Sequence, residues 1–186
     1  MKKFELTNDT KIVFGKKLFR IRALVSFGNV KKDELGGYVE KEENLSHAGN
    51  AWVYGDAEVC DDARVYDDAR VYGNAWVYGN AWVYGDAEVY GNARVYGDAE
   101  VCGNARVYGN ADYTCVKGFG TEYRNTTFYR QKDGSIGVKC GCFYGTIDEF
   151  REQVNKTRDG KIAKEYLMIA DLMEYHFQKE EGVGDE

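Results

Sequence analysis

His47 and His176 are the only side chains of this sequence whose unperturbed pKa suits proton transfer at neutral pH. An imidazole beside a substrate could act as a general base. However, His47 occupies the position at which later repeats of the chain place an inward-facing valine, and His176 lies beside the apolar stripe of an expected helix. We therefore interpret both histidines as structural and predict no catalytic residue.

Cysteines offer a second kind of chemistry, because thiolates bind zinc. Cys140 and Cys142 form a C-x-C pair, and Cys115 lies upstream. A structural zinc site usually has two paired ligand clusters, and the alternation of Cys140 and Cys142 in a strand-like run indicates that both face the core. Cys60 and Cys102 stand where other repeats have tyrosine. We predict that the cysteines are reduced and that the protein has no metal and no cofactor.

Paired carboxylates and one glycine-rich segment also require an interpretation. Asp61-Asp62 and Asp67-Asp68 replace Gly-Asn at two repeat boundaries, where aspartate favours a turn. The segment KGFGTE contains G-x-G, but it lacks the third glycine and the strand-to-helix context of a dinucleotide site. We interpret the aspartates as corner residues and predict no phosphate loop.

The main candidates for binding are aromatic and arginine side chains that recur at fixed spacing between residues 49 and 114. Aromatic rings stack on planar ligands and are enriched at protein interfaces, and arginine pairs with phosphate or carboxylate. Either flanking segments, a second copy or a foreign partner cover these rings, or solvent tolerates them. The candidate ligand-binding or partner-binding residues are Trp52, Trp76, Trp82, Arg64, Arg70, Arg94, Arg106, Tyr72, Tyr78, Tyr84, Tyr90 and Tyr96.

These residues belong to eleven uninterrupted hexads, Gly49 to Thr114, of the form G/D-N/D-A-x-V-Y/C. A period of six does not fit an α-helix, but it fits a short strand followed by a corner. Alternation within A-x-V-Y directs alanine and valine inward, and it directs x and tyrosine outward. The resulting core is small and uniform, which suits a narrow prism.

The hexads resemble those of the hexapeptide-repeat family, whose chains form a left-handed parallel β-helix with three hexads per triangular coil. LGGYVEKEENLSHAGNAWVYG and VKCGCFYGTIDEFREQV extend the resemblance to a group of such proteins from bacteriophages and prophages. The resemblance implies an all-β solenoid in which residues three hexads apart stack at about 4.8 Å. The outward ladders are then Trp52–Arg70–Glu88–Arg106, Glu58–Trp76–Arg94–Asp112 and Arg64–Trp82–Glu100.

Atypical segments flank the repeats and are expected to cap the open ends of the solenoid. Residues 4–28 alternate apolar and polar side chains around FGKK, which indicates a hairpin. The predicted organisation is an N-terminal β cap at 1–48, the β-helix at 49–114, a β-hairpin extension at 115–145, a helical hairpin at 146–180 and a flexible tail at 181–186.

Within the C-terminal part, Asp133-Gly134 indicates the turn of the β-hairpin. Thr146 and Glu149 form a capping box for the first helix, and Gly160 is predicted to end it. The second helix is expected to be amphipathic. Its apolar face consists of Ile162, Tyr166, Ile169, Met173 and Phe177.

Charge and hydropathy exclude two partner classes. The net charge of −6 and the pI near 5.1 disfavour non-specific binding to nucleic acid. No apolar run is long enough to cross a membrane, and the first residues turn polar too early for a signal peptide. We therefore expect a cytoplasmic protein, in the host cytoplasm if a phage encodes it.

Hexapeptide-repeat proteins include acyltransferases, which are trimers with a catalytic histidine near the subunit boundary and a loop that interrupts the coils. The uninterrupted hexads and the positions of the two histidines depart from that pattern. We expect a non-enzymatic binding protein that forms a homo-oligomer, with a trimer favoured. The phage resemblance implies counter-defence, either by binding a host immune protein or by sequestering a nucleotide signal. An acyltransferase and a self-assembling scaffold are the alternative hypotheses.

Overall fold

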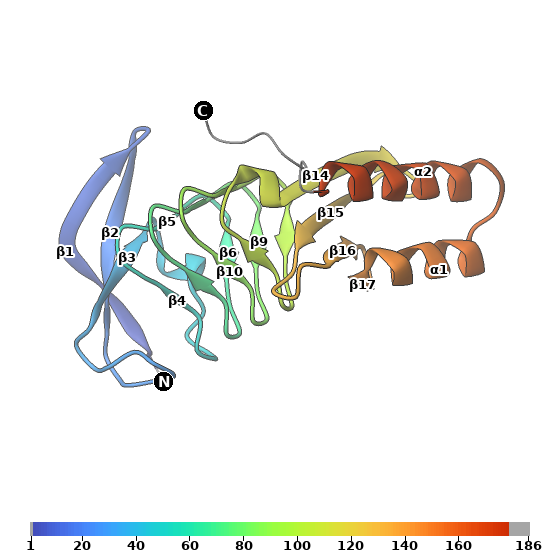
Figure 1. Ribbon diagram of the computed structural model, residues 1–186. Coiled ribbons are helices and arrows are strands. Elements are labelled where there is room, and N and C mark those ends of the chain that lie inside the picture. The colour runs from blue at the N-terminus through green and yellow to red at the C-terminus, as the bar shows by residue number, and fades with distance from the viewer. Residues whose placement is uncertain (1, 179–186) are drawn as a thin grey trace, which may run out of the picture.

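The computed structural model describes residues 2–178, and the predicted tail at residues 181–186 lies outside them. Figure 1 shows three parts that follow one another along one axis: an N-terminal hairpin, a coiled middle and a C-terminal sheet with two helices. None of the helices among residues 2–178 is long and apolar enough to cross a membrane.

The coiled middle consists of ten two-residue strands, each formed by the x and valine positions of a hexad. Alanine and valine bury one side of each strand, and a glycine or aspartate with positive φ turns the chain onto the next face. The strands are β4 (Trp52–Val53), β5 (Glu58–Val59), β6 (Arg64–Val65), β7 (Arg70–Val71), β8 (Trp76–Val77), β9 (Trp82–Val83), β10 (Glu88–Val89), β11 (Arg94–Val95), β12 (Glu100–Val101) and β13 (Arg106–Val107).

These strands form three parallel sheets, which are the faces of the coil. The first face contains β4, β7, β10 and β13, the second contains β5, β8 and β11, and the third contains β6, β9 and β12. Trp52 pairs with Arg70, so residues three hexads apart stack as predicted. The three predicted ladders are confirmed except for Asp112, which lies beyond the last strand of the second face. The fold is a β-solenoid of about four turns.

The core of the solenoid is the predicted column of small apolar side chains. The alanines from Ala51 to Ala105 and the valines from Val53 to Val107 at the hexad positions are all fully buried. The corner prediction is also confirmed, because Asp61 and Asp67 adopt φ values of 59° and 58°, as glycine does at the other corners. The repeat therefore determines both the core and the turns.

The N-terminal cap is a hairpin of β1 (Phe4–Val13) and β2 (Lys16–Ala23), as predicted. Its turn is Phe14-Gly15, with φ of 48° and 80°. Strand β3 (Leu35–Val39) pairs antiparallel with β2 and parallel with β5. The predicted boundary at residue 48 is therefore wrong: the chain already joins the second face at β3.

The chain between β3 and β4 also follows the coil, although its sequence is not a regular hexad. It contains a 3₁₀ helix, η1 (Glu42–Asn44). The buried Asn44 amide donates to the carbonyl oxygens of Asp61 (3.0 Å) and Ala63 (2.9 Å). Leu45 then forms a parallel bridge with Val65 on the third face. In this turn, the Asn44 side chain thus makes hydrogen bonds to the next coil that backbone N–H groups make elsewhere.

The solenoid ends earlier than predicted. The eleventh hexad does not form a strand of the coil: Asn110–Asp112 is a 3₁₀ helix, η2, and Ala111 is exposed. Asp112 accepts from the backbone N–H groups of Tyr108 and Gly109, both at 2.9 Å, and thereby caps this turn. The following strand belongs to the C-terminal sheet.

The C-terminal sheet has four antiparallel strands, which is more than the predicted hairpin: β14 (Tyr113–Phe119), β15 (Arg124–Arg130), β16 (Ile136–Cys140) and β17 (Phe143–Thr146). The predicted turn at Asp133-Gly134 joins β15 to β16. The sheet closes the end of the coil, because the Glu100 N–H donates to Thr127 Oγ1 and the Lys132 N–H donates to the Asn104 carbonyl, both at 3.0 Å.

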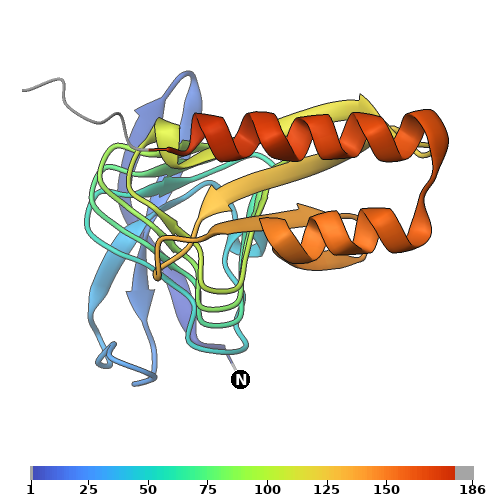
Figure 2. The same ribbon diagram turned by 45° about the vertical axis from the view of Figure 1, so that its right-hand side comes forward.

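Two helices, α1 (Ile147–Thr157) and α2 (Gly160–His176), pack on one side of this sheet (Figures 1 and 2). The capping box is confirmed: Thr146 Oγ1 accepts from the Glu149 N–H, and Glu149 Oε2 accepts from the Thr146 N–H. Gly160 does not end the first helix; α1 ends at Thr157, and Gly160 is the first residue of α2. The predicted apolar face of α2 is confirmed for Tyr166, Ile169, Met173 and Phe177, which pack in the core, whereas the half-buried Ile162 lies outside this cluster.

Candidate functional site

The twelve predicted binding residues lie on three different faces, so they do not form one site. Trp52, Arg70, Tyr72, Tyr90 and Arg106 belong to the first face, Trp76, Tyr78, Arg94 and Tyr96 to the second, and Arg64, Trp82 and Tyr84 to the third. The predicted tyrosine stacking is confirmed, with ring centroids 4.8–5.2 Å apart along each face. Each face must therefore be assessed separately.

The prediction that Trp52 binds a ligand or partner is wrong, because its side chain is fully buried. The N-terminal segment covers it: the Phe27 ring packs edge-on at 5.4 Å and the Phe4 ring at 6.2 Å. Within residues 2–178, the indole N–H has no hydrogen-bond partner. Trp52 joins the cap to the first coil and is not available to a ligand.

On the rest of the first face, Glu88 is the centre of a network of polar contacts. Glu88 accepts a hydrogen bond from the Tyr72 hydroxyl (3.3 Å) and forms ion pairs with Arg106 (3.6 Å) and Lys132 (3.3 Å). Burial, followed by the negative charge of Glu88, raises the pKa of Tyr72 to about 12. These contacts tie the face to the C-terminal sheet and fix its register.

The second face carries a continuous aromatic surface. Trp76 lies between the ring of Phe14, stacked at 5.0 Å, and the ring of Tyr78 at 4.4 Å. Tyr78 stacks on Tyr96 at 5.2 Å, and the Arg94 guanidinium lies 5.9 Å from the Trp76 ring. We call Phe14, Trp76, Tyr78, Arg94 and Tyr96 the aromatic surface; all but Phe14 were predicted.

The tip of the β1–β2 hairpin supplies the residue that the sequence did not reveal. Phe14 stacks on Trp76 with one ring face but is 81% exposed, and Tyr96 is 53% exposed. A hollow of about 500 Å³ borders the other end of the aromatic surface, next to Tyr113 and Cys115. The surface is thus apolar, solvent-facing and bounded by a hollow.

The third face carries an open groove of about 1070 Å³. Arg64, Tyr66 and Trp82 contribute its lining from the coil, and Glu42 and His47 contribute from the chain before β4. Tyr66 packs edge-on against Trp82 at 6.0 Å, and burial raises its pKa to about 12. Tyr66 was absent from the predicted site, although the tyrosine spacing of the hexads could have indicated it.

Tyr84, the other predicted tyrosine of the third face, has a structural role. Its ring stacks on Tyr66 at 4.8 Å, and its hydroxyl donates to Glu100 Oε2 at 3.1 Å. Burial, together with the neighbouring Cys102 and Glu100, raises the pKa of the Tyr84 hydroxyl. The phenol therefore stays protonated and serves as a donor.

His47 has both ring nitrogens engaged. Its Nδ1 accepts the Lys3 backbone N–H at 3.1 Å, so its Nε2 carries the proton that faces Glu42 Oε1 at 2.9 Å. The ring also stacks on Phe4 at 4.3 Å. His176 is exposed near the end of α2, with Phe177 at 5.1 Å. His47 thus fastens the N-terminal segment to the coil.

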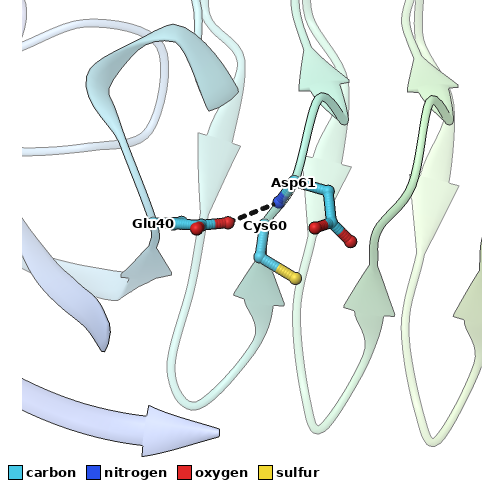
Figure 3. A group of neighbouring side chains, drawn as sticks. All are labelled: Glu40, Cys60 and Asp61. Atoms are coloured by element: carbon cyan, nitrogen blue, oxygen red, sulfur yellow. Dashed lines mark hydrogen bonds between the residues drawn. The ribbon is translucent and has the colours of Figure 1, made fainter. Parts of the chain in front are cut away.

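Within residues 2–178, one group of metal-ligand types occurs, at Glu40, Cys60 and Asp61 on the second face (Figure 3). Glu40 Oε2 accepts the Asp61 backbone N–H at 2.7 Å. The Lys16 ammonium group lies 3.8 Å from Glu40 and contacts Asp61 directly. Burial raises the pKa of the Cys60 thiol, which also accepts the Trp76 indole N–H. The single ammonium group of Lys16 is shared by two carboxylates, and these ion pairs join the hairpin to the coil.

The three C-terminal cysteines are not gathered. Cys115 contacts Thr127, and Cys140 contacts Thr126, so they lie on opposite faces of the C-terminal sheet. Cys142 is exposed in the turn between β16 and β17. The prediction that Cys140 and Cys142 both face the core is therefore wrong, since their alternation ends at this turn.

Comparison with known proteins concerns the coil. The family described as "YdcK Beta solenoid repeat" matches residues 63–79, 69–85 and 87–101. These hexads are similar to YdcK β-solenoid repeats. The matched residues include Trp76, Tyr78, Arg94 and Tyr96 of the aromatic surface, and Arg64, Tyr66 and Trp82 of the groove. No curated protein sequence matches the chain significantly.

Proposed function

We propose that this protein is a non-enzymatic binding protein, a rigid β-solenoid that presents aromatic side chains to a protein partner. The observation that carries the proposal is the aromatic surface of the second face. Phe14 and Tyr96 expose large aromatic areas beside a hollow, and interfaces are enriched in such residues. A folded ladder holds these rings in place before binding, which lowers the entropic cost of association.

The engagement of His47 supports binding rather than acyl transfer. Its two nitrogens already contact Lys3 and Glu42, so a role as general base would require the N-terminal segment to move. The regular coil from β4 to β13 also lacks an interrupting loop of the kind found in hexapeptide-repeat acyltransferases.

The proposal extends to the setting of the protein. We take the coil to be left-handed, in line with its hexads, and the protein to be cytoplasmic. A homo-oligomer, with a trimer favoured, would cover part of the aromatic surface. For a phage-encoded protein, the partner would be a host immune protein and the role counter-defence. A self-assembling scaffold is the alternative that the same surface permits.

The test compares the wild type with the double variant Phe14→Ser/Tyr96→Ser by native mass spectrometry and analytical ultracentrifugation. The control is Tyr108→Ser, which removes a 63%-exposed ring from the first face. We expect a discrete oligomer that dissociates only in the double variant. Open-ended growth of the wild type would instead identify a scaffold.

If the wild type is a monomer, the same variants serve as baits in host lysate, with quantitative mass spectrometry of the captured proteins. A partner lost at least tenfold with the double variant and retained with Tyr108→Ser supports the proposal. The proposal would be rejected if the wild type showed no self-association and captured no such variant-sensitive partner.

A further inference from the structure

The groove of the third face is formed within one chain and is separate from the aromatic surface. Its coil side is the start of the Arg64–Trp82 ladder, and its rim is the irregular turn at residues 42–47. Leu45 and Val65 lie at its base, where the two segments form a parallel bridge. The groove is therefore fixed by backbone pairing on both sides.

Trp82 differs from the other two tryptophans in having an open ring. Trp52 is buried under two phenylalanines, and Trp76 lies between Phe14 and Tyr78. Of the aromatic rings among residues 2–178, only that of Tyr66 packs against Trp82, edge-on, and Trp82 is 41% exposed. No aromatic ring of the described residues is stacked on Trp82, so a planar ligand can take that place.

Arg64, one rung away from Trp82, supplies a positive charge that has no ion-pair partner within the described residues. The neighbouring carboxylate of Asp62 is already paired with Lys41 at 2.7 Å. On the rim, the Lys2 ammonium group pairs with the Glu42 carboxylate at 2.8 Å, and the neutral His47 ring donates to the same carboxylate at 2.9 Å, so the charges of Lys2 and Glu42 compensate each other. The uncompensated cation of the groove is thus Arg64.

The same rim presents a second carboxylate, Glu43, which is exposed. The groove therefore combines an open aromatic ring, a free guanidinium and an acceptor for hydroxyl or amino groups. A planar carboxylic acid would satisfy the first two. A nucleoside phosphate satisfies all three, with its base on Trp82, its phosphate on Arg64 and its sugar hydroxyls toward Glu43.

We propose that this groove binds a nucleoside phosphate. The inference goes beyond the proposed function, because it concerns a different face and a different class of ligand. Base–aromatic stacking tolerates every base, and a guanidinium donates two parallel hydrogen bonds to phosphate oxygens. Trp82 supplies affinity for the base, and Arg64 distinguishes the phosphate from the nucleoside.

The test is isothermal titration calorimetry with adenosine 5′-monophosphate and with adenosine, on the full chain. We expect saturable binding of the monophosphate, about tenfold tighter than adenosine. Arg64→Gln should reduce this to the affinity of adenosine and leave adenosine binding unchanged. Trp82→Ala should weaken both ligands. The matched control is Arg70→Gln, which removes an exposed ladder arginine from the first face and should change neither affinity.

Circular dichroism of each variant checks that the solenoid is retained. No saturable binding of the monophosphate at millimolar concentration, or equal loss with Arg70→Gln and Arg64→Gln, would overturn the proposal. The titration is repeated on Phe14→Ser/Tyr96→Ser. Retained binding there separates the groove from the aromatic surface, so the two proposals can fail independently.

Discussion

Lys3 is the clearest case in which a single side chain couples pH to the stability of the cap. It is 3% exposed, and its ammonium group donates to the carbonyl oxygens of Ala51 (2.9 Å) and Gly49 (3.4 Å). Burial lowers the pKa of Lys3 to about 8, against a partly opposing effect of Asp68. Folding therefore disfavours the charged form.

The sign of the pH effect follows from this pKa. Because the unfolded chain titrates Lys3 near 10.5, it binds more protons than the folded chain between pH 8 and 10.5, so stability rises with pH in that window. Between pH 7.5 and 9.5 we expect the stability of the wild type to increase by about 1 kcal/mol relative to Lys3→Met, after allowance for solvent screening. Urea unfolding of both proteins at each pH measures it; a constant difference would contradict the assignment.

At the scale of elements, the docking of β3 on the coil depends on a close backbone approach at Gly37. A Cβ atom at this position would lie 2.5 Å from the Ala57 carbonyl oxygen and 2.7 Å from Val53 Cγ1. Both neighbours belong to the rigid coil, so they cannot move without disturbing the ladder. The absence of a side chain allows the cap to join the second face.

Gly37→Ala should therefore destabilise the protein by about 2 kcal/mol through overpacking. The control is Gly109→Ala, where the added Cβ meets no atom within 4 Å and the backbone is extended. Gly109→Ala should change the free energy of unfolding by less than about 0.5 kcal/mol. Chemical denaturation measures both, and equal effects would refute the role of the close contact.

The same elements explain what the sequence could predict. Alternation of Ala51, Val53 and their equivalents is local, so it determines strands, corners and ladders directly. The structure at the two ends of the coil depends on tertiary contacts that the hexad repeat does not predict. Asn44 holds its turn through side-chain hydrogen bonds, and Asp112 closes the last turn in place of a strand. Trp52 shares the hexad pattern with Trp82, and its burial follows from the distant cap.

The candidate site was partly predictable for the same reason. Spacing alone placed Trp76, Tyr78, Arg94 and Tyr96 on one face, because pairing at a fixed interval is a property of the repeat. The groove needed tertiary information, since its rim comes from residues 42–47, which have no hexad signature. Phe14 likewise reaches the aromatic surface only through the hairpin fold.

For the whole molecule, the coil should be the most stable unit. Backbone ladders link each coil to the next, for example from Tyr78 to Val95 and from Tyr84 to Val101, both at 3.0 Å, and both ends are capped. The two helices pack on the C-terminal sheet, which lies beyond the coil (Figure 2).

In hydrogen exchange measured by mass spectrometry, we expect peptides from residues 75–90 to exchange at least tenfold more slowly than those of α1 and α2. Opening of the helices exposes only the surface of one sheet, whereas opening of a central coil breaks contacts on both sides. Equal protection of helices and coil would mean that the molecule unfolds as a single unit.

Trp52 pairs with Arg70, three hexads further along the chain. Three hexads are therefore the unit by which a solenoid of this kind can change length during evolution. Duplication of three hexads lengthens the prism by one strand spacing, about 4.8 Å, and returns the C-terminal sheet to the same face. Duplication of one hexad adds a third of a turn and swings that sheet to an adjacent face. Duplications of three hexads thus change only the length of the prism, whereas duplications of one or two hexads also change the side on which the C-terminal sheet lies.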